Sequence, residues 1–317
     1  MKTGIILTNV GTPDSPTPTA VRSFLRDFLS DRRVVEMPRF VWLPILYGII
    51  LTTRPRASAK LYKKIWTDQG SPLLVYSQLI AHKLEEKLQC PVVLGMNYGN
   101  PSIQNALEEL RAKSVDKIIV LPLFPQYSAT TTAASFDIVA ASLKTWRVLP
   151  AIEVINQYAT NESYIASLTH SIKTFWSAHG QAPHLLFSFH GIPERFVNSG
   201  DPYPEWCHAT ARLVAEQLNL SANQWSVSFQ SRLGRAKWLT PYTEHVLSAL
   251  PKNGTTHLQV VCPGFAVDCL ETLEEIAIRG KKQFIEAGGK IFEYIPALND
   301  SDEQVNTLAK VIFPNIV

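Results

Sequence analysis

Short apolar runs rich in β-branched residues alternate along the chain with longer segments whose apolar positions repeat at helical spacing. This alternation is typical of parallel β-sheets that are covered by helices. Four strands are predicted before residue 160 and four after it, at 4–10, 91–96, 117–124, 148–155, 184–190, 224–230, 256–263 and 290–295. The predicted helices cover 18–30, 72–88, 101–113, 128–143, 161–179, 203–219, 240–250, 268–287 and 301–312.

The two halves of the chain follow the same pattern. The first predicted strand runs into Gly11-Thr12-Pro13, and the fifth runs into Gly191-Ile192-Pro193. In the first half, 111 positions separate Gly11 from Pro122 at the end of the third strand. In the second half, 72 positions separate Gly191 from Pro263 at the end of the corresponding strand, so the first half is longer by 111 − 72 = 39 residues. We therefore predict two similar α/β domains, over 1–158 and 159–300. The helix within 301–317 is expected to pack back on the first domain.

The extra length of the first half corresponds to segment 31–70, which is predicted to be an insertion. Residues 31–64 contain eight basic and two acidic side chains, a local charge of +6 in a chain whose net charge is +3. Within it, the apolar run 40–51 is interrupted by Pro44 and Gly48 and is too short to span a bilayer. Two interpretations are open. The run is either a buried pair of helices or an exposed amphipathic lip that contacts a membrane or admits an apolar ligand.

The composition fits a compact globular protein, with 46% hydrophobic and 18% charged residues. The small net charge gives no indication of nucleic-acid binding. The four cysteines show no CxxC spacing and no disulfide framework. The N-terminus leads directly into a predicted strand, so no signal peptide is expected and a reducing, cytoplasmic location is predicted.

His190 ends the predicted strand 184–190, and the Gly191-Ile192-Pro193 that follows favours a sharp turn. Ligands of open α/β sheets bind beyond the carboxyl ends of the strands. A neutral imidazole at that edge can bind a divalent metal ion or accept a proton. The alternative is a histidine that only forms structural hydrogen bonds at the edge of the sheet.

A line of acidic side chains follows the seventh predicted strand. Asp268, Glu271 and Glu275 are spaced to share one face of the next helix, and Glu274 lies beside them. Acidic residues also stabilise a helix N-terminus through its dipole, so an ordinary well-capped helix is the alternative. The functional interpretation is a path for a cation or for protons, in which Glu271 and His190 open toward one cleft between the domains.

Two further features are suited to a flat ligand. The segment 123–132, which contains Tyr127 and Ser128, reads as a strand, a proline turn and a helix start that leaves backbone N–H groups available to a ligand carboxylate. Four aromatic residues fall at predicted strand ends or in loops: Tyr98, Tyr127, Trp238 and Phe265. Ordinary capping and core packing are the alternatives. The nucleotide and esterase motifs GxxxxGK[ST], GxGxxG and GxSxG are missing from the sequence.

Five blocks of sequence occur in an order that resembles the ferrochelatase family, in its short bacterial form without an iron–sulfur cluster. The blocks are LFPQYS at 123–128, SFHGIP at 188–193, DPYP at 201–204, FQSRLG at 229–234 and PGFAVDCLETLEE at 263–275. The resemblance extends over nearly the whole chain. It implies two Rossmann-like domains, each a four-stranded parallel sheet flanked by helices, with porphyrin in the cleft between them.

The resemblance also implies roles for individual residues. His190 and Glu271 match the proposed iron ligands of the family, and Asp268 and Glu275 match its acidic ridge, beside which Glu274 lies. The porphyrin-binding positions that we expect are Asn9, Tyr98, Tyr127, Ser128, Trp238 and Phe265. Segment 36–70 matches the lip of the family, and peripheral contact with the inner face of a membrane is expected through 36–56.

The implied reaction is insertion of Fe²⁺ into protoporphyrin IX, the last step of haem synthesis, catalysed by a lyase that releases two pyrrole protons and forms protohaem. Iron is then a substrate, and no permanently bound cofactor is expected. A [2Fe–2S] cluster is not expected either, because no cysteine follows Cys269. Some relatives have a histidine in place of Cys269, which weakens any case for a third imidazole ligand. A cobalt chelatase acting on a corrin precursor, or a non-catalytic haem or metal carrier, are the alternatives.

Overall fold

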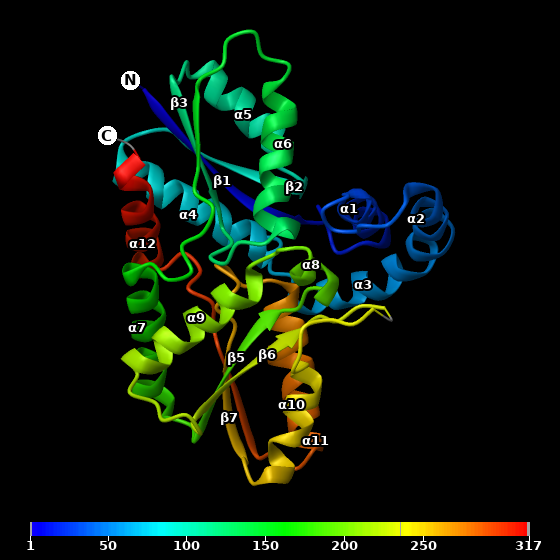
Figure 1. The fold of residues 1–317 in the computed structure, drawn as a ribbon, viewed down its shortest axis with the longest axis vertical. Coiled ribbons are helices and arrows are strands. Elements are labelled where there is room, and N and C mark those ends of the chain that lie inside the picture. Colours follow the sequence, from blue (N-terminus) through cyan, green and yellow to red (C-terminus); the bar gives the residue numbers. More distant parts are fainter. Residues whose placement is uncertain (1, 235, 316–317) are drawn as a thin grey trace. The chain divides into compact units, whose positions relative to one another are not determined.

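The computed structural model describes residues 2–234 and 236–315, and the chain divides into two compact units (Figure 1). Unit 1 comprises Met1–Phe124, Ser128–Gln157 and Leu308–Val317. Unit 2 comprises Pro125–Tyr127 and Tyr158–Thr307. The last helix, α12 (Asp302–Ile312), begins in unit 2 and ends in unit 1.

Unit 1 is built on a parallel sheet with the strand order β2-β1-β3-β4. Its strands are β1 (Thr3–Thr12), β2 (Val92–Gly99), β3 (Lys117–Pro122) and β4 (Ala151–Val154). In the central strand β1, Ile5 pairs with Val92 on one side and with Ile119 on the other. Nearly every residue of β1 is buried, as expected for a parallel strand with both faces covered.

Apolar packing fixes the helices beside this sheet, which are α4 (Pro72–Leu88), α5 (Ile103–Ala112) and α6 (Ala134–Leu143). Leu107 of α5 and Val139 of α6 share a buried cluster with Ile6, Ile118 and Val120 of the strands. These two helices therefore cover the same face of the sheet. A π-helical turn, Ala129–Ala133, precedes α6.

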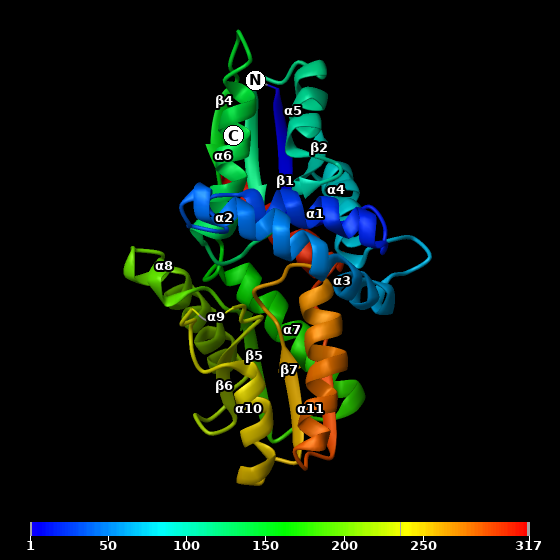
Figure 2. The ribbon, with the colours of Figure 1, turned by 90° about the vertical axis from the view of Figure 1, so that its right-hand side faces the viewer.

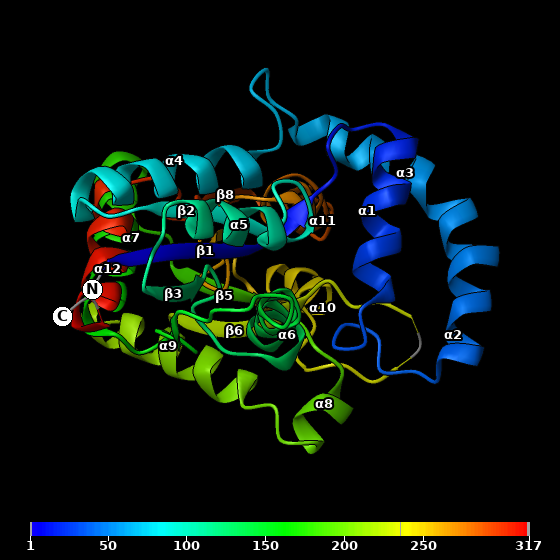
Figure 3. The same ribbon diagram turned by 90° about the horizontal axis from the view of Figure 1, so that it is seen from above.

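A separate helical layer of unit 1, drawn in blue in Figures 2 and 3, corresponds to the predicted insertion and the helix before it. Its elements are α1 (Pro18–Ser30), α2 (Arg39–Ile45), a π-helical turn (Leu46–Ile50) and α3 (Leu51–Ile65). Leu29, Trp42 and Leu46 are buried in one apolar cluster, whereas Phe40 is 81% and Ile49 is 60% exposed. The run 40–51 is thus amphipathic, and the prediction of a fully buried helical pair is wrong.

Unit 2 repeats the topology of unit 1. Its parallel sheet has the order β6-β5-β7-β8, which is the order of the first sheet with each strand number raised by four. The strands are β5 (His184–His190), β6 (Trp225–Gln230), β7 (His257–Val261) and β8 (Ile291–Ile295). The prediction of two similar four-stranded α/β units is confirmed.

Helices cover both faces of the unit 2 sheet, and Figure 1 shows the strands between α7 and α9 on one side and α10 and α11 on the other. The helices are α7 (Glu162–His179), α8 (Glu194–Asn198), α9 (Tyr203–Gln217), α10 (Thr243–Ala249), a π-helix (Leu270–Gly280) and α11 (Lys281–Glu286). Leu247 and Phe284 pack on Leu258 of β7. The next residue of β7, Gln259, accepts a hydrogen bond from Trp176 of α7, as expected where successive side chains point to opposite faces.

All eight predicted strands are present, and the differences from prediction concern the helices. The helices α2, α3 and α8 were not predicted. The predicted helix 268–287 begins at Leu270, and its first 11 residues are π-helical. Short 3₁₀ turns lie at Pro251–Asn253 and Phe313–Asn315. Within the described ranges, no helix is long and apolar enough to cross a membrane.

A buried polar network lies between β7 and β8. Glu293 accepts hydrogen bonds from His257 at 3.0 Å and from Gln259 at 2.8 Å. Burial by itself would raise the pKa of Glu293, but the hydrogen bonds from His257 and Gln259 and the charge of His257 together lower it below its ordinary value of 4.5. A carboxyl group whose pKa is lower in the folded state stabilises the fold above its unfolded pKa, and the benefit is lost as the pH falls through the folded value.

We expect Glu293→Gln to lower the free energy of unfolding by about 1 kcal/mol at pH 7, because the charged acceptor is lost. The difference from wild type should shrink as the pH falls below 4.5. Urea unfolding at several pH values measures both effects. Glu286→Gln is the control, because the Glu286 side chain is 66% exposed. A pH-independent difference would contradict the prediction.

Candidate active site

His190 is the last residue of β5 and lies at the carboxyl end of the unit 2 sheet. It pairs with Gln230, the last residue of β6, and the Gly191 N–H donates to the Gln230 carbonyl oxygen at 2.8 Å. A Cβ atom on Gly191 would lie 3.0 Å from that oxygen and 3.3 Å from the ring of Trp238. The glycine therefore allows a close turn beside these neighbours, and the His190 side chain is left half-buried.

The imidazole of His190 has a defined hydrogen bond. Its Nδ1 atom lies 2.6 Å from the carbonyl oxygen of Gly191. A carbonyl oxygen only accepts hydrogen bonds, so Nδ1 carries the proton when the ring is neutral. The lone pair of a neutral His190 is consequently on Nε2, where it is available to a metal ion or to a proton.

Two aromatic rings flank His190. The centroid of Trp238 lies 6.4 Å and that of Phe265 lies 6.5 Å from the His190 centroid. The loop carrying Trp238 is held by backbone pairing, because Glu194 N donates to Lys237 O and Leu239 N donates to Ile192 O, both at 3.0 Å. Of the four aromatic residues expected to bind porphyrin, Trp238 and Phe265 lie beside His190.

Glu271 is the second residue of the π-helix Leu270–Gly280, so its side chain lies at a helix N-terminus, where a negative charge is favoured. It is half-buried and hydrogen-bonded to the thiol of Cys269. Burial and the nearby charge of Glu271 raise the pKa of the Cys269 thiol well above its ordinary value. The thiol is therefore protonated and donates to the carboxylate.

Gln230 links the segments that carry His190 and Glu271, although no pattern in the sequence selects it as an individual residue. Its Nε2 atom donates to the backbone oxygen of Glu271 at 2.7 Å, and its main chain pairs with His190. His190 ends β5, and β7 leads into the helix that carries Glu271. Because β5 and β7 are parallel neighbours, both segments leave the sheet at its carboxyl end.

Asp268 does not share a helical face with Glu271 and Glu275, contrary to prediction. It precedes the helix and is buried, with 4% of its surface exposed. Its carboxylate accepts hydrogen bonds from the side chains of Thr272, Tyr294 and Asn299 at 2.9, 2.6 and 2.8 Å. The spacing argument failed for Asp268 because the N-cap residue, Cys269, is extended, so Asp268 lies before the first helical turn.

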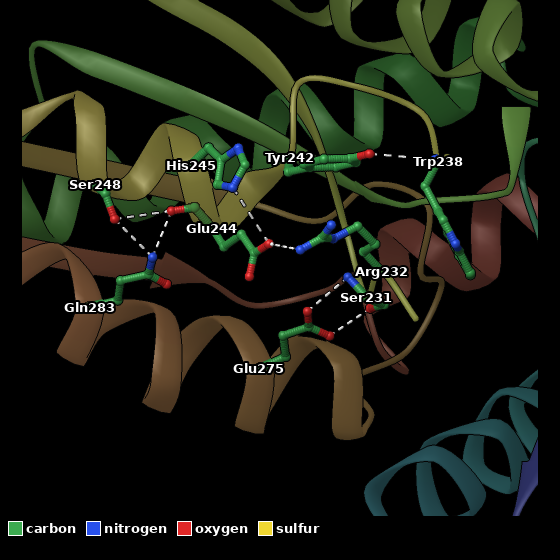
Figure 4. A network of polar contacts seen from close by, with 9 residues as sticks. All are labelled: Ser231, Arg232, Trp238, Tyr242, Glu244, His245, Ser248, Glu275 and Gln283. Carbon is green, nitrogen blue, oxygen red and sulfur yellow. Dashed lines mark hydrogen bonds and ion pairs between the residues drawn. The ribbon is translucent and has the colours of Figure 1, made fainter. Parts of the chain in front are cut away.

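The other two acids have partners of their own. Glu274 is buried and lies 3.4 Å from the Nε atom of Arg279. Glu275 accepts hydrogen bonds from the backbone N–H and the hydroxyl of Ser231, at 2.8 and 2.5 Å, as Figure 4 shows. Glu275 therefore attaches the start of the loop after β6 to the π-helix.

A small cavity of about 110 Å³ lies beside this contact, between β6, α10 and the π-helix. Its lining includes Glu275, Arg232 and Glu244. Figure 4 shows the Arg232 guanidinium directed at Glu244, with a separation of 3.0 Å. The charges of Arg232 and Glu244 therefore compensate each other.

The remaining predicted porphyrin-binding residues lie in other parts of the fold. Asn9 and Tyr98 are buried in unit 1, where they are hydrogen-bonded to Ser77 and Asp31. Ser128, also in unit 1, caps the π-helical turn before α6. Tyr127 belongs to unit 2 and is half-buried.

Comparison with known proteins identifies the family. A family model described as "Ferrochelatase" matches residues 2–316. The chain belongs to the ferrochelatase family. Among similar curated proteins, "Ferrochelatase 1" of Shewanella oneidensis is 51% identical over 315 residues, covering 98% of this chain and 94% of that protein. The "Ferrochelatase" of Vibrio atlanticus is 50% identical over 311 residues, covering 98% and 97%.

Solved structures of low sequence identity share the ferrochelatase-type fold. SirB from Bacillus subtilis, solved with Fe³⁺, gives a TM-score of 0.61 at 12% identity and covers 99% of this chain and 95% of its own. CbiX, described as the terminal enzyme of sirohaem synthesis in denitrifying bacteria, gives 0.52 at 13% identity, with 98% of each chain covered. Within 2–234 and 236–315, no group of three or more His, Cys, Asp or Glu side chains could hold a metal ion.

We expect neutral His190 to carry its proton on Nδ1, because that atom faces the Gly191 carbonyl. Long-range ¹H–¹⁵N spectra of labelled enzyme distinguish the two tautomers. His190→Gln assigns the signals by removing them. Signals showing Nε2 protonated in the neutral ring would contradict the structure.

Proposed function

We propose that His190 and Glu271 form the catalytic pair through which this enzyme transfers Fe²⁺ into protoporphyrin IX. As a ferrochelatase, the protein is a lyase that forms protohaem, and Fe²⁺ is its substrate. Two N–H bonds of the porphyrin break and four Fe–N contacts form as the ion enters, so two protons must be accepted. The observation that carries the proposal is an available Nε2 lone pair at the same sheet edge as the Glu271 helix.

The two groups have complementary tasks in this proposal. Imidazole nitrogen and carboxylate oxygen both bind divalent iron, and a site with few protein ligands can release the ion to the porphyrin nitrogens. Once the ion has left, His190 Nε2 has a free lone pair for one pyrrole proton, and the Glu271 carboxylate is free to accept the other. The Glu271 carboxylate, supported by the Cys269 thiol and the helix N-terminus, compensates the positive charge.

We propose that Trp238 and Phe265, which flank His190, contact the porphyrin face. A rigid aromatic wall can use binding energy to bend the macrocycle and expose its nitrogen lone pairs. Tyr127, Asn9, Tyr98 and Ser128 remain candidates for porphyrin contact. Asp268, Glu274 and Glu275 remain candidates for a path that removes protons or delivers the metal ion.

The cobalt-chelatase and carrier alternatives are not favoured. The curated relatives named above are ferrochelatases at about half identity over nearly the whole chain. The likeness to SirB and CbiX, at 12% and 13% identity, concerns the fold. The absence of a resident cofactor and of an iron–sulfur cluster remains part of the proposal.

We expect His190→Ala to lower the rate of metalloporphyrin formation by about 10²- to 10⁴-fold, because the proton acceptor and one metal ligand are lost. Protoporphyrin binding should persist, since Trp238 and Phe265 remain. Wild-type enzyme should also insert Zn²⁺, because imidazole and carboxylate accept both ions. Zinc-porphyrin fluorescence measures turnover, and quenching of protein fluorescence measures binding.

His170→Ala is the control, because the His170 side chain is 63% exposed on α7. Equal activity of His190→Ala and wild type would remove the catalytic assignment. Loss of porphyrin affinity without a selective loss of turnover would favour a carrier.

We also propose that the exposed face of 36–56 contacts a membrane surface. Phe40, Tyr47 and Ile49 are 81%, 47% and 60% exposed, and Arg54 and Arg56 follow on α3. Apolar side chains next to basic ones are typical of helices that lie in the interface of an anionic bilayer.

Replacing Phe40 and Ile49 together by Ser should weaken binding to phosphatidylglycerol vesicles by about tenfold or more. The reason is that burial of two large apolar side chains in the bilayer stabilises binding by several kcal/mol. Vesicle co-sedimentation measures the change. Val148→Ser, at an equally exposed position of unit 1 outside this layer, is the matched control. Equal loss in both variants would contradict a specific membrane face.

A further inference from the structure

Gln230 is almost fully buried at the carboxyl end of β6, with 3% of its surface exposed. Its side-chain amide makes contacts in two directions. Nε2 donates to the backbone oxygen of Glu271 at 2.7 Å, and Oε1 accepts from the Ser188 hydroxyl at 2.7 Å. The Cys262 sulfur lies 3.6 Å from the same Oε1 atom. The amide thus connects β5, β7 and the π-helix.

The carbonyl oxygen of Glu271, which can only accept, fixes the orientation of this amide, and a chain of buried hydroxyl groups continues from it. The Ser188 hydroxyl lies 2.9 Å from that of Thr243, which lies 2.8 Å from that of Ser228. Each hydroxyl has one proton, and Ser188 donates to Gln230. Ser188 therefore accepts from Thr243, which in turn accepts from Ser228. All hydrogen bonds of this chain therefore donate in one direction, from the Ser228 hydroxyl to the carbonyl oxygen of Glu271.

This network places polar groups in the core of unit 2, where apolar side chains are usual. The hydroxyl groups of Ser188 and Ser228 are 0% exposed, and Leu186 and Leu258 nearby belong to the apolar core. A fully satisfied buried network contributes less to stability than to a unique arrangement of its members. A methionine would fill the space of Gln230 and would not hold the Glu271 backbone.

We propose that Gln230 is a positioning residue for the metal-handling pair. Its main chain fixes the strand end that carries His190, and its side chain fixes the helix start that carries Glu271. The inference rests on the proposed function of that pair. Outer hydrogen-bond partners of metal ligands typically change metal affinity or activity by 10- to 100-fold when they are removed.

The chain offers a matched control in Gln259, a second buried glutamine of the same sheet. It is 0% exposed and accepts hydrogen bonds from Trp176 Nε1 and Ala182 N, at 2.7 and 3.0 Å. Its Nε2 donates to Gly180 O and Glu293. Gln259 is the middle residue of β7 and pairs with Leu185, which lies five residues before His190.

The experiment compares Gln230→Met with Gln259→Met in full-length enzyme, with Zn²⁺ and protoporphyrin IX varied independently. We expect Gln230→Met to lower kcat/KM for Zn²⁺ by about 10- to 100-fold, while KM for protoporphyrin stays within a factor of about two. Gln259→Met should lower the melting temperature and leave both kinetic parameters near wild type. Gln230→Glu, assayed at a pH high enough to ionise the new carboxyl so that it only accepts hydrogen bonds, should behave as Gln230→Met does.

Equal kinetic parameters for the two methionine variants would overturn the positioning role, as would equal changes for metal and porphyrin. If neither Gln230 variant folds, Ser188→Ala supplies the same comparison, because it removes the hydroxyl that holds the amide through Oε1. An unchanged metal dependence there would also overturn the inference. Failure of the proposed function is recognised separately, by inactive wild type or by active His190→Ala.

Discussion

The parallel pairing of β5 with β6 on one side and β7 on the other is the constraint on which the candidate site depends. Parallel strands end at the same edge of a sheet, so this pairing brings together chain segments that are far apart in sequence. His190 ends the central strand, Gln230 ends its neighbour, and the segment after Val261 leads to Glu271. A slip in either register would separate the imidazole from the carboxylate.

The two units have the same sheet topology, but their chemistry differs. Residues of β1 and β5 that correspond in the repeated pattern are Val10 and His190, each followed by glycine. Unit 1 has an aliphatic side chain where unit 2 has an imidazole. Its additional length, segment 31–70, instead contributes α2, the π-helical turn and α3, which together with α1 form a helical layer with an exposed apolar face. The shared fold is therefore a scaffold, and the residues at its strand ends determine the activity.

Two polar groups buried near the site, the Asp268 carboxylate and the Gln230 amide, are satisfied by specific partners. Asp268 accepts three side-chain hydrogen bonds, and Gln230 is joined to a chain of hydroxyl groups. An unsatisfied polar group at such a position would cost several kcal/mol. These networks consequently favour one arrangement of the π-helix and the strand ends. A defined arrangement is what the proposed pair, His190 and Glu271, needs in order to hold a metal ion and then release it.

The sequence by itself determined the number of strands and their positions along the chain, the two-fold repetition and the selection of His190 and Glu271. Strand patterns and motif blocks are local, so they can be read along the chain. The tertiary structure decided that Leu270–Gly280 is π-helical, that Asp268 is a buried acceptor outside the helix, and that Gln230 reaches Glu271. These features depend on contacts between segments 26 to 41 residues apart, and side chains brought together by folding leave no periodic signal in the sequence.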